Sequence, residues 1–104
     1  MNTRCLAVIA ALSISATAAA GDGEALLKQH NCSACHAVAS KAVGPSLIDI
    51  ATKYKGDKGA QARLEAKVRK GGAGSFGSMP MPPTAKTVSD DDIKTLVTWI
   101  LSQK

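Results

Sequence analysis

Aromatic side chains are scarce in this chain of 104 residues, which has one Tyr, one Phe and one Trp. A chain of this length forms a single domain. A domain so small buries too little surface to be comfortably stable, and it often depends on a disulfide, a metal or a cofactor. With so few large apolar side chains, we expect another group to fill the middle of the fold. The scarcity of aromatics and the lack of a basic run also disfavour nucleic-acid binding, because little is present to stack on bases.

Long apolar runs are lacking too, apart from one near the start of the sequence. Residues 5–14 are mostly apolar, Arg4 precedes them, and three alanines at 18–20 follow. This order of a positive charge, an apolar stretch and small residues is typical of a secretory signal peptide. The run is shorter than the roughly 20 residues that span a bilayer, which disfavours a membrane anchor. We therefore expect cleavage between Ala20 and Gly21, export to the periplasm, and a soluble mature domain of residues 21–104.

The charge of the mature domain is positive. Loss of Arg4 with the signal peptide would reduce the basic residues from 13 to 12, against 8 acidic ones, for a net charge near +4. This excess favours a partner with an acidic docking surface, while a solvated surface without a specific partner is the plainer alternative. Nothing in the sequence indicates association of copies, so we expect a monomer.

No alternation of apolar and polar residues indicates a strand in residues 21–104. Apolar residues recur instead at helical spacing, with capping residues at their edges. We therefore predict an all-α fold with about four short helices. These are a first helix capped by Asp22 and ending near residues 30–31, a second from Leu47 to Gly56, a third from Gly59 to Lys70 that stops at Gly71, and a last one capped by Ser89.

The last predicted helix is the most clearly marked. Three aspartates, 90–92, lie at its positive end, and an apolar stripe runs along one face. Trp99 falls outside the centre of that stripe, so we expect it to pack against a second surface.

Residues 71–83 contain four glycines and three prolines, which exclude a regular helix or a central strand. A loop of this composition is either flexible or fixed by something that it binds. It also contains both methionines of the mature domain, Met79 and Met81.

The segment Cys32-Ser33-Ala34-Cys35-His36 has the C-x-x-C-H spacing of covalent haem attachment. In this chemistry two thiols add to the two vinyl groups of a porphyrin, and the adjacent histidine ligates the iron from one face. A disulfide or redox-active pair is an alternative in an exported protein, but no βαβ pattern surrounds the cysteines. Zinc is a second alternative, although it normally takes four ligands in paired spacing. We therefore predict one haem c, attached at Cys32 and Cys35, with His36 on its iron.

The second axial position of that iron can be filled by a methionine, by another histidine, or left open. Met79 and Met81 both lie far enough along the chain to reach the opposite haem face. His30 is the competing ligand, but it directly precedes the attachment motif. The residues alone favour methionine and do not choose between the two.

The chain resembles the small bacterial class I cytochromes c, most closely the cytochrome c-551/c-552 family. The matching segments span nearly the whole mature domain, and they are Cys32–His36, Val43-Gly44-Pro45, Met81-Pro82-Pro83, Val88–Asp91 and Trp99–Lys104. The resemblance implies the small cytochrome c fold wrapped around one haem, with Met81 as the second axial ligand. It also implies that the Pro45 carbonyl accepts a hydrogen bond from the His36 ring. Relatives often have Trp at the position of Phe76, with its indole N–H near a haem propionate, so Phe76 is expected near the haem without that donor.

A six-coordinate iron has no vacant position for a substrate, and the sequence shows no nucleophile–base pair or paired carboxylates. We therefore expect a carrier of single electrons and not an enzyme. The resemblance implies respiratory membrane complexes as electron donors and a terminal oxidase or nitrite reductase as acceptor. The alternatives are a haem sensor or peroxidase-like protein from which Met81 dissociates, and a disulfide oxidoreductase without haem.

Overall fold

The computed structural model describes residues 10–11 and 20–104. This part of the chain contains a 3-10 helix and four α-helices, and it has no strand, only an isolated bridge between Gly72 and Met81. The elements are α1 (Ala20–Gln29), η1 (Cys32–Ala34), α2 (Leu47–Lys53), α3 (Ala60–Lys70) and α4 (Asp90–Leu101). The all-α prediction is therefore confirmed. Most of the predicted signal peptide, residues 1–20, lies outside the described residues, so its cleavage stays a prediction.

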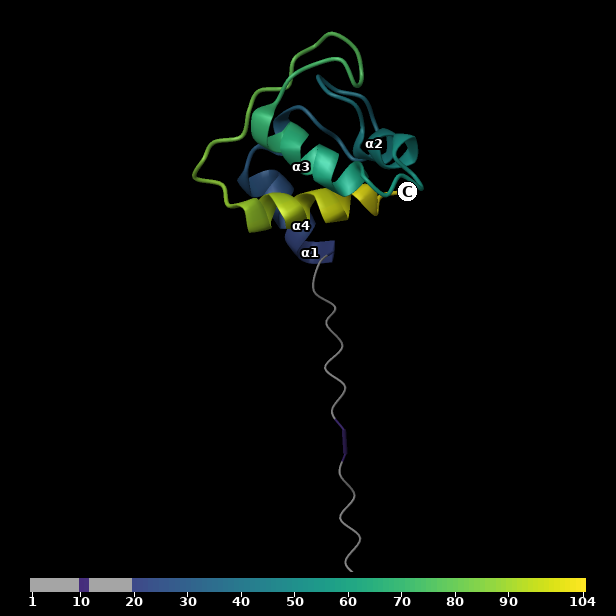
Figure 1. Cartoon of the computed structure of the whole chain (residues 1–104), viewed down its shortest axis with the longest axis vertical. Helices are drawn as coiled ribbons and strands as arrows, with labels where there is room; N and C mark the ends of the chain where they lie inside the picture. Colours follow the sequence, from purple (N-terminus) through teal and green to yellow (C-terminus); the bar gives the residue numbers. More distant parts are fainter. Residues whose placement is uncertain (1–9, 12–19) are drawn as a thin grey trace, which may run out of the picture.

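Helix α4 is the centre of the fold, and it contacts α1, α2 and α3 (Figure 1). It begins where predicted, because the Ser89 hydroxyl accepts a hydrogen bond from the Asp92 N–H at 3.1 Å. Its apolar stripe is buried, with Val97 fully inaccessible to solvent. Burial of this stripe against three other helices holds the domain together.

Two clusters of buried residues lie along α4. One consists of Leu27, Leu47, Leu96, Trp99 and Ile100, and the other of Val68, Ile93 and Val97. Trp99 packs against α1, where a side chain at Gly23 would overlap the Trp99 Cβ. The prediction that Trp99 meets a second surface is thus confirmed, and a small residue in α1 makes the contact possible.

The ends of the other helices agree with the predicted capping residues in α3 and differ from them in α1 and α2. Gly59 and Gly71 flank α3 as predicted. Helix α2 begins after Ser46, whose hydroxyl accepts from the Asp49 N–H, and ends at Lys53, earlier than the predicted Gly56. The prediction that Asp22 caps the first helix is wrong, because α1 begins at Ala20 and Asp22 lies within its first turn. A carboxylate there still stabilises the positive end of the helix.

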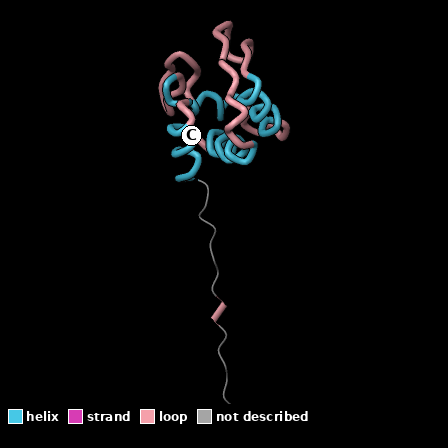
Figure 2. Tube along the Cα trace, turned by 90° about the vertical axis from the view of Figure 1, so that its left-hand side faces the viewer, coloured by secondary structure: helices cyan, strands magenta, loops and turns pink. Residues whose placement is uncertain are grey.

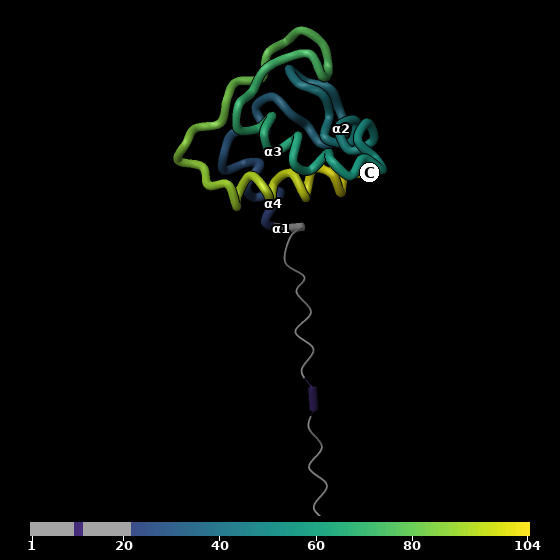
Figure 3. Tube along the Cα trace, in the orientation of Figure 1, coloured from purple at the N-terminus to yellow at the C-terminus, as the bar shows by residue number. Residues whose placement is uncertain are grey.

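The loops gather on the side of the domain away from α4. The Gly- and Pro-rich loop that follows α3 arches over this side toward α2 (Figure 3), and the view turned by 90° shows loop segments at the top of the domain, with helical turns on both sides below them (Figure 2). The loop is tied at its base, since Gly72 and Met81 exchange two backbone hydrogen bonds of 2.9 Å. Residues of this loop and of the helices line one cavity, which is the candidate site.

Candidate haem site

A cavity of about 750 Å³ lies between the helices and the Gly- and Pro-rich loop. This volume is within the usual range for a cofactor pocket. All six residues that the sequence singled out line it, and they are Cys32, Cys35, His36, Pro45, Phe76 and Met81. Residues that are up to 49 positions apart in the chain are thus brought to one space.

The inner wall of the cavity is apolar. Leu27 and Leu47 line it from one buried cluster, and Val68 and Val97 line it from the other. Such a wall suits a large, flat, mostly apolar ligand with polar groups only at its margin. The cysteine pair offers the two thiols for covalent attachment and the adjacent histidine offers a nitrogen ligand for the iron, so the residues present fit a haem c.

His36 is held in one orientation. Its Nδ1–H donates a hydrogen bond of 2.8 Å to the Pro45 carbonyl, so the interaction that the resemblance implies is present. A carbonyl can only accept, which fixes the proton on Nδ1 and leaves Nε2 as the ring nitrogen with a lone pair for a metal. A side chain on Gly44 would lie 2.6 Å from His36 Cε1, so the ring rests directly on the main chain of Gly44.

The two cysteines are positioned by η1, an element that the sequence did not predict. Asn31 precedes it in the left-handed region, with φ 59°, and the N–H groups of Cys35 and His36 both donate to the Cys32 carbonyl, at 3.1 and 3.0 Å. Cys32 and Cys35 are partly buried and are not joined as a disulfide. Burial raises the pKa of the Cys32 thiol; a backbone hydrogen bond opposes this, and the neighbouring Cys35 adds to it.

Met79 and Met81 differ in their surroundings, although both line the cavity. Met81 packs against the cluster of Val68, Ile93 and Val97, and its main chain is bonded to Gly72. Met79 is 66% exposed. Only the Met81 thioether therefore lies on a segment that the fold holds in place.

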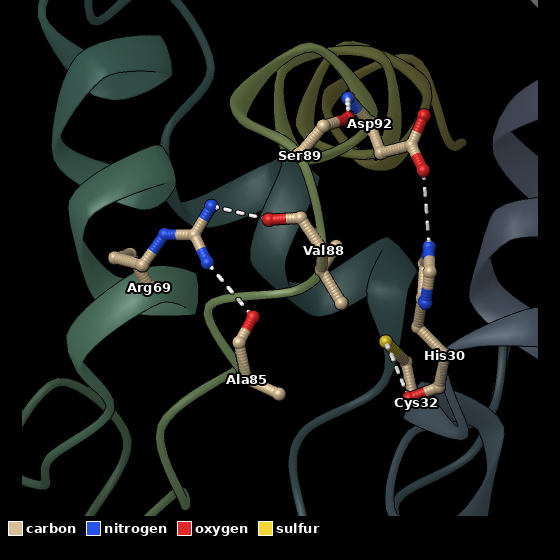
Figure 4. A network of polar contacts seen from close by, with 7 residues as sticks. All are labelled: His30, Cys32, Arg69, Ala85, Val88, Ser89 and Asp92. Atoms are coloured by element: carbon tan, nitrogen blue, oxygen red, sulfur yellow. Dashed lines mark hydrogen bonds and ion pairs between the residues drawn. The ribbon is translucent and has the colours of Figure 1, made fainter.

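His30, the competing ligand, does not line the cavity. Its Nε2 lies 3.2 Å from Asp92 Oδ2 at the start of α4 (Figure 4). Its ring therefore ties the end of α1 to α4, and the bis-histidine alternative loses its donor. Asp92 thus has two roles, since its N–H takes part in the cap of α4 and its carboxylate contacts His30. The sequence did not predict the contact with His30.

Lys53 was also missed by the sequence analysis. Its ammonium group lies 4.3 Å from the centroid of the Phe76 ring and donates to the Ser75 carbonyl. A cation over an aromatic face is attracted by the ring. These contacts join the end of α2 to the tip of the loop, over 22 residues of sequence, and no local pattern could have indicated them.

Two further observations concern metal sites and membrane spans. Among the described residues, no three His, Cys, Asp or Glu side chains gather as a metal site. No helix within the described ranges has the length and apolar character needed to cross a membrane.

Comparison with known proteins identifies the family of the chain. A family model described as cytochrome c matches residues 20–104. Cytochrome c-551 of Pseudomonas aeruginosa is 48% identical over 85 residues, which cover 82% of this chain and 80% of that protein. Cytochrome c-552 of Nitrosomonas europaea is 42% identical over 104 residues, the full length of both. The crystal structure of wild-type Nitrosomonas europaea cytochrome c552 matches with a TM-score of 0.74 and 47% identity, over 78% of this chain and 99% of that chain.

These matches cover the cavity, the C-x-x-C-H positions and all four α-helices. The fold is that of the small class I cytochromes c, and the cofactor is one covalently bound haem c. The protein is accordingly a monohaem electron carrier whose partners are redox proteins. The chain belongs to the cytochrome c family.

Proposed function

We propose that this protein is a periplasmic carrier of single electrons, with haem thioethers at Cys32 and Cys35 and with His36 and Met81 as axial ligands of the iron. The observation that carries the proposal is that one cavity is lined both by the C-x-x-C-H turn and by the anchored Met81. Haem iron between a histidine and a methionine supplies a one-electron couple with a raised reduction potential.

The chain's own residues keep this site closed to other chemistry. Pro45 holds the His36 ring through the 2.8 Å hydrogen bond, and Gly72 holds the main chain of Met81. With both axial positions filled, neither oxygen nor a substrate has direct access to the iron. The apolar wall of Leu47 and Val97, both almost fully buried, keeps water away and disfavours the extra positive charge of the oxidised state.

Phe76 lines the cavity near its mouth. It has no N–H to offer a haem propionate, and Lys53 is the cation beside its ring. We therefore expect the reduction potential to differ from that of relatives with Trp at this position, because the propionate loses one donor.

Partner docking is expected at the mouth of the cavity. Val43 and Met79 are 56% and 66% exposed there and offer apolar contacts, and Lys41 lines the same cavity. A small apolar contact on a domain with a positive net charge suits brief encounters with acidic surfaces. We propose respiratory membrane complexes as donors and a terminal oxidase or nitrite reductase as acceptor. Electron transfer to such a partner should slow as salt concentration rises.

The first experiment is an absorption spectrum of the exported protein, oxidised and reduced, before and after acid–acetone extraction. Colour that survives extraction, with the weak far-red band of methionine on ferric iron, is the expected result. A colourless protein from a host that attaches haem would contradict the thioethers, and colour without the far-red band would contradict Met81 ligation. Rapid carbon monoxide binding to the reduced protein at neutral pH would favour the sensor or peroxidase-like alternative.

A further inference from the structure

The segment from Met81 to Ser89, called here the Met81 arm, connects the Gly- and Pro-rich loop to α4. It contains no helix or strand beyond its bridge to Gly72. Pro82 and Pro83 have no N–H groups, so this part of the arm has few hydrogen bonds to make by itself. A thioether is a weak ligand, and its place over the iron therefore depends on whatever holds the arm.

The last turn of α3 holds the beginning of the arm. Gly72 and Met81 exchange two hydrogen bonds of 2.9 Å. The Thr84 hydroxyl donates to the Val68 carbonyl at 2.7 Å, and the Thr84 N–H donates to the same carbonyl at 3.2 Å. The main chains also approach closely, since a side chain on Gly71 would lie 2.8 Å from Pro83 N.

Arg69 holds the rest of the arm. Its Nη1 donates to the Ala85 carbonyl at 3.0 Å, and its Nη2 donates to the Val88 carbonyl at 2.7 Å (Figure 4). Nη2 also lies 2.8 Å from Asp90 Oδ1. The side chain of Arg69 is 26% exposed, so most of it is shielded from water. The fixed fork of a guanidinium can bind two carbonyls at once, which a lysine cannot do in the same geometry.

We propose that Arg69 is a positioning residue for Met81. By joining α3 to two carbonyls of the arm, it limits the movement of the whole segment away from the cavity. This inference rests on the proposed function, in which Met81 is an axial ligand. Only three residues separate Met81 from Ala85, two of them are prolines, and the third is the anchored Thr84. Ala85 and Met81 are therefore joined by a short, stiff segment, and Arg69 holds this segment against α3 together with Thr84.

The two carbonyl contacts carry this role, and the ion pair with Asp90 does not. The Asp90 side chain is 96% exposed, and pairs of that kind contribute little because water and salt screen them. Hydrogen bonds from a charged, shielded donor to main-chain carbonyls contribute more. Asp90→Ala and Arg69→Ala should therefore behave differently.

The test uses the haem-loaded protein and measures how tightly the ferric form binds imidazole, which must displace the methionine. The far-red band reports the displacement, and thermal unfolding is recorded on the same samples. For Arg69→Ala we expect an imidazole affinity at least about tenfold above wild type, because the loss of a single hydrogen bond of this kind from the closed state already has that effect. Asp90→Ala should stay within about twofold of wild type.

Arg63→Ala is the matched control. Arg63 lies on the same helix and is 59% exposed, and its guanidinium pairs with Asp57 and not with the arm. It should leave imidazole affinity unchanged. Arg69→Lys keeps the charge and can reach one carbonyl, so its affinity should fall between wild type and Arg69→Ala. This variant also carries the test if Arg69→Ala does not give a folded protein.

Four results would overturn the inference. The first is an Arg69→Ala protein that unfolds at lower temperature but binds imidazole like wild type, since Arg69 then stabilises the fold alone. The second is an equal rise in affinity for Arg63→Ala. The third is an Arg69→Lys protein that binds imidazole like wild type. The fourth is a wild-type protein without the far-red band, which would contradict Met81 ligation as well and is thereby distinguished from the other three.

Discussion

The contact between His36 and Gly44 gives the sharpest test of how the site is built. In Gly44→Ala the new Cβ would lie 2.6 Å from His36 Cε1, 3.0 Å from Nδ1 and 3.1 Å from Nε2. The main chain cannot easily retreat, because the Gly44 N–H donates to the Cys35 carbonyl at 2.8 Å. The ring must therefore move, and any such movement strains its 2.8 Å hydrogen bond to Pro45.

The cost can be estimated from these two effects. Inserting a methyl group into a filled space costs about 1–3 kcal/mol. Loss of the His36–Pro45 hydrogen bond adds about 0.5–1.5 kcal/mol. The free energy of unfolding should therefore fall by roughly 2–4 kcal/mol. For a domain of this size that corresponds to a Tm lower by roughly 10–25 °C.

Denaturant and thermal unfolding of the oxidised, haem-loaded protein measure this change. Gly56→Ala is the control, since Gly56 has φ +78° but nothing within 4 Å of its new Cβ. It carries only the backbone cost, about 1–2 kcal/mol. If Gly44→Ala destabilises no more than Gly56→Ala, and its spectrum is that of wild type, the packing of His36 on Gly44 is not what holds the ring.

Three further changes test the fold and its dependence on haem. Val97→Ala truncates a fully buried side chain of α4 that also lines the cavity, and the free energy of unfolding, measured with denaturant, should fall by about 2 kcal/mol. A fall of less than about 0.5 kcal/mol would contradict the place of Val97 in the core. Ser89→Ala removes the cap of α4 and should cost about 1 kcal/mol in the same assay, whereas Ser89→Thr should retain most of the stability. The double variant Cys32→Ala, Cys35→Ala, which cannot attach haem, should be largely disordered, because nothing then fills the cavity of about 750 Å³. Circular dichroism measures this, and a native-like helical spectrum would refute it.

The parts of the fold that could be predicted are those whose cause is local. Ser89 and the aspartates after it mark the start of α4, and Gly71 marks the end of α3, because caps act within a few residues. The start of α1 was predicted wrongly, because an Asp is favoured both as a cap and within the first turn of a helix. Helix α1 begins two residues before Asp22, at Ala20, and the Asp22 carboxylate lies in its first turn instead of capping it.

The same distinction between local and long-range causes applies to the site. The C-x-x-C-H segment is local and was recognised from its spacing alone. The sequence left Met79 and Met81 open except through the family resemblance, and the packing that separates them comes from α3 and α4. The contacts of Lys53 with Phe76 and of Arg69 with Ala85 join residues 16 or more positions apart. Such contacts depend on how the elements lie in space, and no periodicity encodes them.

The scarcity of aromatic residues and the position of the cavity have one explanation. The two buried clusters along α4 each turn part of their surface toward the cavity, Leu27 and Leu96 from one and Val68 and Val97 from the other. Without a group between them, this apolar surface would be left to water, which disfavours the folded chain. A haem c in that space supplies the apolar area that large side chains provide in other small domains. With the haem bound, the same wall would keep water from the iron and favour its reduced state. Substitutions that open the wall should therefore lower the stability and the reduction potential together, and a variant that lowers only one of them would show that the two depend on different surfaces.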